Sequence, residues 1–262
     1  MGQITQHPEG TFCWYELLAE DLSLARAFYT QLFGWSTQDN PIGEGLVYVM
    51  LQKDGQDVGA MYQISDSQKK SGLRPGWLSY IAVDNVDATA EQARSLGAQV
   101  VYEPLDVFTA GRMSLLTDPA GAFFALWQAR EHPGAGVVRE PGTFCWNELI
   151  TTDADAAEAF YTRLFGWTTE VGDFDGFKYT SFLREGSPVG GMMPMIKEWG
   201  DTPSHWLIYF AVDDCDAVAE KASSLGASLQ VPPMDVPEVG RFSLIRDPQG
   251  GTFAIIRLLQ ET

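Results

Sequence analysis

The stretch GTFCWYELLAEDLSLARAFYTQLFGW at residues 10–35 decides the fold, because it returns at residues 142–167 as GTFCWNELITTDADAAEAFYTRLFGW. Seventeen of these 26 positions are identical at a constant offset of 132 residues. A second pair of segments, 77–127 and 206–256, matches at 27 of 51 positions with an offset of 129. The 262-residue chain is therefore a tandem duplication, and an internal repeat of this size sets the architecture before any other signal.

Each half contains one order of elements twice. Residues 12–18 are rich in aromatic and apolar side chains, which is typical of a strand, and Asp21 then stands where a helix N-cap is expected. Apolar residues at helical spacing follow and end at Gly34, a residue that commonly terminates helices. Apolar stretches around 46–51 and 58–64 complete the unit, and the second quarter repeats the plan. The pattern indicates four βαβββ units.

The predicted fold class is α+β. One unit has a sheet face covered by its helix and a second face that needs a partner, so two units should form a curved mixed sheet, or cup, of about eight strands with the helices outside. We expect domain 1 at 1–128 (units near 10–64 and 76–128), a linker at 129–141, and domain 2 at 142–262 (units near 142–197 and 205–259). The sequence leaves open which units pair.

Composition excludes several classes of protein. The chain has 35 acidic and 17 basic residues, a formal net charge of −18 that disfavours nucleic acid and anionic membrane surfaces as partners. No apolar run approaches the ~20 residues of a membrane span, and the first residues do not resemble a secretory signal. Three cysteines give no disulfide framework. We expect a cytoplasmic protein, monomeric or homodimeric, whose partner is a small organic ligand.

Two motifs carry a family resemblance. A-x-A-F-Y-T-x-L-F-G-W follows the first strand of each half, and D-P-x-G precedes the last strand. This arrangement resembles the vicinal oxygen chelate superfamily of glyoxalases, bleomycin-resistance proteins and extradiol dioxygenases, and most of all its tandem glyoxalase-like branch, whose members are often labelled hydroxylases or lyases.

The resemblance implies a metal site in many members, but the residues that would form it differ here. Metal-dependent members commonly carry His on the first strand, His or Gln on the strand that opens the second unit, and Glu on the last strand. The matching positions of this chain hold Trp14 and Trp146, Leu78 and Leu207, and Ala125 and Ala254. A transition metal needs three or four N, O or S donors, so we predict no metal cofactor.

Strand alternation predicts what lines each cup once Trp14 is placed at the former ligand position. Phe12 and Glu16 then share its face, Tyr80 lies on the inward face of its strand, and Trp127 does the same on the last strand. The face of Arg112 is not fixed by the pattern. The candidate ligand-binding residues are Phe12, Trp14, Arg112, Trp127, Phe144, Trp146 and Arg241.

Glu16 and Glu148, with Tyr80 and Tyr209, are the candidate catalytic residues. A carboxylate in such a cup has a raised pKa and can act as a general base, with the phenol as a hydrogen-bond donor. The alternative is a structural role, in which each glutamate is paired with an arginine and each aromatic residue is core packing. The same alternative holds for Arg112 and Arg241, which can form structural ion pairs instead of binding an anionic ligand.

Three functions remain open, and whether the protein is an enzyme is undecided. The first is metal-free binding of a small organic molecule, with proton transfer next to a carbonyl by Glu16 or Glu148 in a lyase-, isomerase- or hydroxylase-like reaction. The second is non-catalytic sequestration of a drug or metabolite, for which the negative charge favours a cation. The third is a metal-dependent glyoxalase or oxygenase. For that reading His205, whose counterpart is Gly76, could form part of a site with Glu148.

Overall fold

The computed structural model describes all residues except 1–3, 44, 175–176, 197–198, 201 and 260–262. The elements of the first half are β1 (Phe12–Ala19), α1 (Leu22–Phe33), β2 (Ser36–Gly43), β3 (Leu46–Lys53), β4 (Gln56–Gln63), α2 (Asp66–Lys70), β5 (Gly76–Ala82), α3 (Val86–Ser95), β6 (Gln99–Val107), β7 (Gly111–Thr117) and β8 (Phe123–Ala129). Those of the second half are β9 (Phe144–Thr151), α4 (Ala154–Phe165), β10 (Thr168–Phe174), β11 (Phe177–Arg184), β12 (Ser187–Pro194), β13 (His205–Ala211), α5 (Cys215–Ser224), β14 (Ser228–Val236), β15 (Gly240–Arg246) and β16 (Thr252–Leu258).

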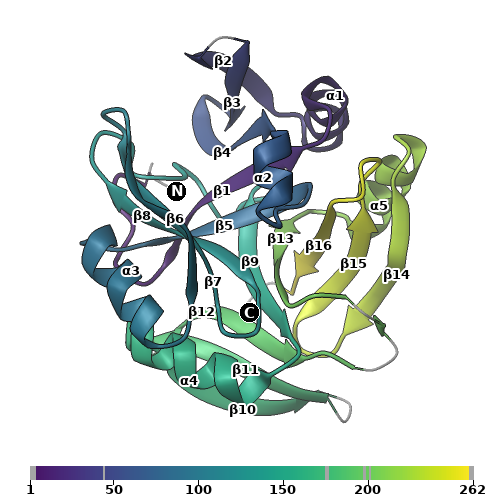
Figure 1. The fold of residues 1–262 in the computed structure, drawn as a ribbon. Coiled ribbons are helices and arrows are strands. Elements are labelled where there is room, and N and C mark those ends of the chain that lie inside the picture. The colour runs from purple at the N-terminus through teal and green to yellow at the C-terminus, as the bar shows by residue number, and fades with distance from the viewer. Residues whose placement is uncertain (1–3, 44, 175–176, 197–198, 201, 260–262) are drawn as a thin grey trace.

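The predicted α+β fold of βαβββ units is confirmed, and neighbouring units along the chain are the ones that pair. The first sheet has the order β2-β3-β4-β1-β5-β8-β7-β6 and the second has β10-β11-β12-β9-β13-β16-β15-β14 (Figure 1). In each sheet the first strands of the two units, β1 with β5 and β9 with β13, run antiparallel at the centre. Each half of the chain therefore builds one complete eight-stranded mixed sheet.

Local sequence explains the repeated helix of each half. The Asp21 carboxylate accepts the N–H groups of Ser23 and Leu24 at the start of α1, and Asp153 caps α4 through Ala156. Gly34 ends α1 with φ of 73°, a left-handed conformation that glycine adopts without strain. The short helix α2 forms between β4 and β5 because Ser65 and Gln68 make a reciprocal capping box.

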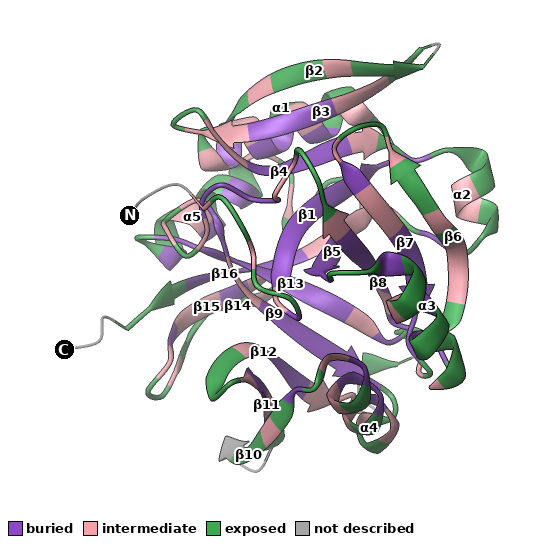
Figure 2. Ribbon diagram, turned by 90° about the vertical axis from the view of Figure 1, so that its left-hand side faces the viewer, coloured by how far each residue is buried: buried purple, intermediate pink, exposed green. Residues whose placement is uncertain are grey.

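The two halves share one hydrophobic core. Side chains on the helix-facing side of both sheets join a single buried cluster with α1 and α4, including Tyr29, Tyr161 and Phe210. The opposite face of each sheet forms a separate apolar cluster. Buried residues accordingly concentrate in central strands such as β1 and β13, whereas β2 and the outer side of α3 are exposed (Figure 2). The halves are packed together on one side and leave two separate faces on the other.

Reciprocal hydrogen bonds cross the boundary between the halves. The Tyr29 hydroxyl donates to Asp247 Oδ2 at 2.8 Å, and the Tyr161 hydroxyl donates to Asp118 Oδ2 at 3.1 Å. Each aspartate opens a D-P-x-G turn whose backbone N–H groups bind its other oxygen, as Ala122 does for Asp118. The repeated motif therefore joins each half to the helix of the other.

Of the helices in the described part of the chain, none is both long and apolar enough to cross a membrane.

Candidate functional site: two aromatic cups with a buried carboxylate

The face of each sheet that is turned away from the shared core carries the candidate site. We call the face lined by Trp14, Glu16, Tyr48 and Tyr80 cup 1. Its counterpart, lined by Trp146, Glu148, Tyr179 and Tyr209, is cup 2.

Strand register brings the predicted residues of cup 1 together. Trp14 in β1 lies opposite Tyr80 in β5, and Tyr80 lies opposite Ala125 in β8. Glu16 forms the adjacent row, between Ala60 in β4 and Leu78 in β5. The glutamate therefore stands at the centre of the sheet, where the two units meet.

A chain of hydrogen bonds surrounds the carboxylate of cup 1. The Tyr80 hydroxyl donates to Glu16 Oε2 at 2.8 Å, and the Tyr48 hydroxyl is a second hydrogen-bond partner of Glu16. The Trp14 indole N–H donates to the Tyr48 oxygen at 3.0 Å, which orients that hydroxyl toward the glutamate. Two phenols and one indole thus hold the carboxylate in a fixed position.

Cup 2 repeats this arrangement. The Tyr209 hydroxyl donates to Glu148 Oε1 at 3.0 Å, and the Trp146 indole donates to the Tyr179 hydroxyl oxygen at 2.9 Å. Tyr179 is a hydrogen-bond partner of Glu148 as well. A Cβ atom at Gly191 would lie only 1.9 Å from the Tyr179 hydroxyl, so the tyrosine in its present position occupies space that a larger residue would take.

Burial dominates the electrostatics of both glutamates. Each is only 7% exposed, and desolvation raises the pKa of Glu16 and of Glu148, while the tyrosine hydrogen bonds oppose that rise. No Lys, Arg or His among the described residues contributes to either pKa. Each cup therefore holds a buried carboxyl group without a cationic partner, and such a group has a higher proton affinity than a solvated glutamate.

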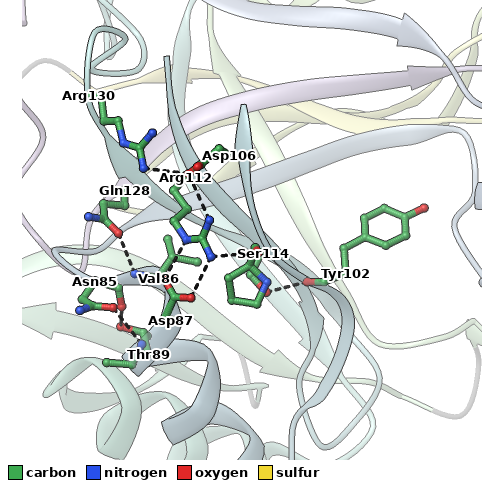
Figure 3. A network of polar contacts seen from close by, with 12 residues as sticks. Asn85, Val86, Asp87, Thr89, Tyr102, Asp106, Arg112, Ser114, Gln128 and Arg130 are labelled. Carbon is green, nitrogen blue, oxygen red and sulfur yellow. Dashed lines mark hydrogen bonds and ion pairs between the residues drawn. The ribbon is translucent and has the colours of Figure 1, made fainter. Parts of the chain in front are cut away.

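The two arginines lie outside the cups. Arg112 donates from Nε and Nη2 to both oxygens of Asp87 in the first turn of α3, at 2.7 and 2.8 Å, and from Nη1 to Asp106 (Figure 3). Arg241 makes the same bonds to Asp216 and Asp235. The structure thus places Arg112 and Arg241 in ion pairs beside the helices and not among the residues that line the cups. Strand alternation turns these side chains toward the helices, and the arginines hold the pKa of Asp87 and of Asp216 below its usual range.

Phe12 and Phe144 also lie outside the cups. A register shift between Phe12 and Trp14 interrupts the alternation of β1, and a matching shift lies between Tyr209 and Phe210 opposite Phe144. Phe12 packs edge-on against Trp206 with ring centroids 5.0 Å apart, and Phe144 stacks on Tyr15 at 3.8 Å. Strict alternation placed both rings in the cups, but the bulges turn them into the shared core.

Trp127 does line cup 1, together with part of the expected linker. Its ring lies 6.4 Å from that of Tyr80, and its indole N–H donates to the His132 carbonyl oxygen at 3.0 Å. The His132 imidazole packs edge-on against Trp14 with centroids 4.5 Å apart. Ala135, fully buried in the same cluster, donates its N–H to the Cys13 carbonyl oxygen at 2.8 Å. The segment between the halves therefore covers one end of cup 1.

Sequence reasoning missed Tyr48 and Tyr179. Both were detectable, because LVYVML at 46–51 and FKYTSF at 177–182 align with an offset of 131 and place a tyrosine at the same position of each half. Neither His132 nor Gly191 had such a signal, since their roles depend on contacts between distant segments.

Comparison with known proteins now assigns the family. The profile described as the Glyoxalase/Bleomycin resistance protein/Dioxygenase superfamily matches residues 11–126 and again 142–255. The chain belongs to this superfamily. It is 42% identical to CFP32 of Mycobacterium bovis, provisionally named a glyoxylase, over 98% of both chains. It is also 32% identical to the anthracycline biosynthesis protein DnrV of Streptomyces peucetius, covering 97% of this chain and 96% of the relative.

Solved structures of the superfamily share the fold at low sequence identity. The Mn(II)-bound glyoxalase of Novosphingobium aromaticivorans superimposes with a TM-score of 0.64 at 17% identity, over 100% of this chain and 85% of the other. Homoprotocatechuate 2,3-dioxygenase of Brevibacterium fuscum gives a TM-score of 0.66 at 14% identity, over 99% and 83% of the two chains. These likenesses concern the fold alone.

The side chains of the cups do not match the metal-ligand pattern expected for metal-dependent members of this superfamily. Within the described ranges, no group of three or more His, Cys, Asp or Glu residues gathers closely enough to hold a metal ion. The strands around Glu16 carry the apolar residues Leu78 and Ala125. The Glu16 carboxylate itself is hydrogen-bonded to Tyr80 and Tyr48. A transition metal requires more N, O or S donors than this. The donor set of neither cup fits such an ion.

Proposed function

We propose that each cup binds a small, partly flat organic molecule and that its glutamate transfers a proton next to a carbonyl group. The observation that carries this proposal is the buried carboxyl group of Glu16 and of Glu148, held by tyrosines and lacking a cationic partner among the described residues. A purely structural glutamate at this depth would normally be paired with a cation. Membership of a superfamily that includes glyoxalases is consistent with chemistry at a carbonyl compound.

The proposed step conserves atoms and charge without any co-reactant. The carboxylate accepts the proton from the carbon beside the carbonyl, and the C–H electron pair becomes the C=C bond of an enolate. The enolate oxygen then accepts a hydrogen bond from Tyr80 in cup 1 or from Tyr209 in cup 2. Protonation of the glutamate weakens its hold on the phenol, so the hydroxyl becomes free to turn toward the new negative charge.

The test uses acetophenone, a flat ketone with exchangeable protons beside its carbonyl, and ethylbenzene as the matched compound without the carbonyl. Quenching of tryptophan fluorescence measures binding, and NMR in D2O measures deuterium uptake by the methyl group. We expect uptake that the double variant Glu16→Gln/Glu148→Gln reduces at least a hundredfold, the usual scale of general acid–base catalysis. Uptake at the wild-type rate in that folded double variant refutes the proposal.

A second candidate is sequestration of an organic cation. Two features favour it, namely the unpaired carboxyl group inside aromatic walls and the net charge of −18. Aromatic rings around a carboxylate attract ammonium groups through their π faces. Phenyltrimethylammonium, compared with tert-butylbenzene of similar shape, separates the candidates. Tight binding of the cation without any deuterium uptake by acetophenone favours sequestration over catalysis.

A further inference from the structure

Four large aromatic side chains on the cup face of the first half have smaller counterparts in the second half. Aligned by the repeat, the pairs are Trp127 and Ile256, Phe123 and Thr252, Tyr102 and Val231, and Tyr62 and Met193. All four aromatic residues contact the apolar cluster that lines cup 1. The glutamate and its tyrosine partners are repeated in both cups, so the cups differ in the walls around a common centre.

Two substitutions add bulk to cup 2. His205 stands where the first half has Gly76, and Phe242 stands where it has Met113. Nδ1 of His205 lies 2.9 Å from the Pro203 carbonyl oxygen, so the ring is held beside the start of its own strand. Phe242 is partly exposed where it packs against the cluster of cup 2. Because four aromatic side chains are lost and two rings are gained, the walls of cup 2 are less bulky.

The segment between the halves adds a cover to cup 1 and is fastened there by its backbone. Beside the contacts of His132 described above, the Gly136 N–H donates to the Asp57 carbonyl oxygen at 2.7 Å. A Cβ atom at Gly134 would lie 2.3 Å from the Cys13 carbonyl oxygen, so the segment approaches β1 more closely than a residue with a side chain would allow. A ligand that enters cup 1 at this end must displace a segment that is bonded to both β1 and β4.

The exposure of equivalent side chains follows the same difference. Three residues of the cup 1 cluster are buried, with exposed fractions of 0% for Cys13, 5% for Trp14 and 2% for Leu115. Their counterparts in cup 2 are partly exposed, namely Cys145, Trp146 and Leu244. Cup 1 is therefore packed like a protein interior, which has little room for an added group, whereas the wall of cup 2 reaches solvent.

We propose that the two cups select ligands by size: cup 2 accepts a fused two-ring ketone, and cup 1 accepts no more than a single ring. Trp127 and Ile256 decide the difference. The Trp127 indole packs near Tyr80 and holds the covering segment through the His132 carbonyl oxygen, so a second ring in cup 1 must displace both. The smaller Ile256 leaves that place to the ligand. This inference rests on the proposed function, because it concerns the ligand of the same glutamates.

The first test measures binding, which needs no proton transfer. The eight tryptophans are replaced by 5-fluorotryptophan, and ¹⁹F NMR follows Trp14 in cup 1 and Trp146 in cup 2 during titration with 2-acetylnaphthalene or with its single-ring counterpart acetophenone. Trp14→Phe and Trp146→Phe assign the two signals. We expect 2-acetylnaphthalene to shift the Trp146 signal at a concentration about tenfold below that needed for Trp14, and acetophenone to discriminate less between the cups. Equal midpoints for 2-acetylnaphthalene, or no response of Trp146, overturn the proposal.

Exchanging the deciding residue between the cups gives matched variants. Trp127→Ile should lower the midpoint of the Trp14 signal for 2-acetylnaphthalene about tenfold, and Ile256→Trp should raise that of the Trp146 signal by a similar factor. In each variant the signal of the other cup is the internal control. If either chain fails to fold, Trp127→Leu or Ile256→Phe takes its place. Unchanged midpoints in both folded variants refute the proposal, because these residues then do not set the size limit.

The second test separates the size preference from the proposed chemistry. Glu16→Gln leaves only cup 2 with its glutamate, and Glu148→Gln leaves only cup 1 with its glutamate. Deuterium uptake by the methyl group of 2-acetylnaphthalene should be about tenfold slower in Glu148→Gln than in Glu16→Gln. Uptake by neither variant, with the NMR preference intact, refutes the proposed function and leaves size selection in place. Equal uptake by both variants refutes size selection and leaves the proposed function in place.

Discussion

At the scale of single residues, the two cups are defined by glutamates whose surroundings are aromatic instead of cationic. Among the residues that the structure describes, the carboxylates of Glu16 and Glu148 find tyrosine hydroxyls as hydrogen-bond partners, whereas an unfolded chain would expose both carboxylates to water. Their raised pKa values mean that the folded protein binds more protons than the unfolded chain between the unfolded and folded pKa values. Stability from these two groups must then fall as pH rises through that interval.

The pH dependence of stability tests this electrostatic picture. Compared with wild type, Glu16→Gln/Glu148→Gln should gain relative stability as the pH rises from about 4.5, since glutamine carries no charge to desolvate. Each unit by which a pKa is raised corresponds to about 1.4 kcal/mol. Urea unfolding at pH 5 and pH 8 measures the difference. A constant difference between variant and wild type across this range contradicts the raised pKa values.

Variants of the arginines and of the cup tryptophans should differ in their effect on ligand binding. Arg112→Gln/Arg241→Gln removes the ion pairs that join β7 to the first turn of α3 and β15 to the first turn of α5, so the melting temperature should drop slightly while binding of a cup ligand stays as in wild type. Trp14→Leu/Trp146→Leu should weaken binding at least tenfold, because the indoles form cup walls and orient Tyr48 and Tyr179. Fluorescence from the remaining tryptophans, or calorimetry with the same ligand, compares the two double variants. Equal losses of affinity in the two double variants would show that the arginines belong to the binding site.

At the scale of elements, the period-two pattern predicted the strands and most of their faces, but not the bulges. It placed Glu16 and Tyr80 together because their strands are regular from Trp14 onward. It misplaced Phe12, because one inserted residue reverses the face of everything before it. The pattern alone left the face of Arg112 open, and the structure shows that it lies on the helix side of β7, where it bonds to Asp87.

A glycine in β12 offers a prediction at this scale. Gly191→Ala places a methyl group where the Tyr179 hydroxyl now lies, so the tyrosine must move away from Glu148. We expect a loss of about 1–3 kcal/mol in unfolding free energy, as for other overpacked sites, and weaker ligand binding in cup 2. Its matched control is Ala60→Gly in cup 1, where the register is the same but a methyl group is already accommodated. If Gly191→Ala unfolds in urea with the stability of wild type, Tyr179 can adopt another position without a loss of stability.

At the scale of the whole molecule, the duplication was evident from the sequence, but the way the halves join was not. The repeated A-x-A-F-Y-T and D-P-x-G motifs were visible separately, and only the structure shows that Tyr29 reaches Asp247 while Tyr161 reaches Asp118. The segment at 129–141 was expected to link the two halves. In the structure it also contributes His132 and the buried Ala135 to cup 1.

The shared core predicts that the halves unfold together. Tyr29→Phe should lower the unfolding free energy by about 1–3 kcal/mol, because Asp247 loses a buried hydrogen bond. Tyr161→Phe should lower the unfolding free energy by a similar amount, because Asp118 loses the corresponding hydrogen bond. Both variants should keep a single unfolding transition by fluorescence and by circular dichroism. Two separate transitions in either variant would show that each half is stable alone.

The crossed Tyr–Asp bonds carry a consequence for the origin of the chain. Each half holds one donor and one acceptor, and each finds its complement on the other half in the same geometry. A protein made of a single half would present to its own copy the same pair of groups that the tandem chain satisfies internally. Two copies of a single half, related by a two-fold axis, could therefore satisfy both bonds in the way that the tandem chain does.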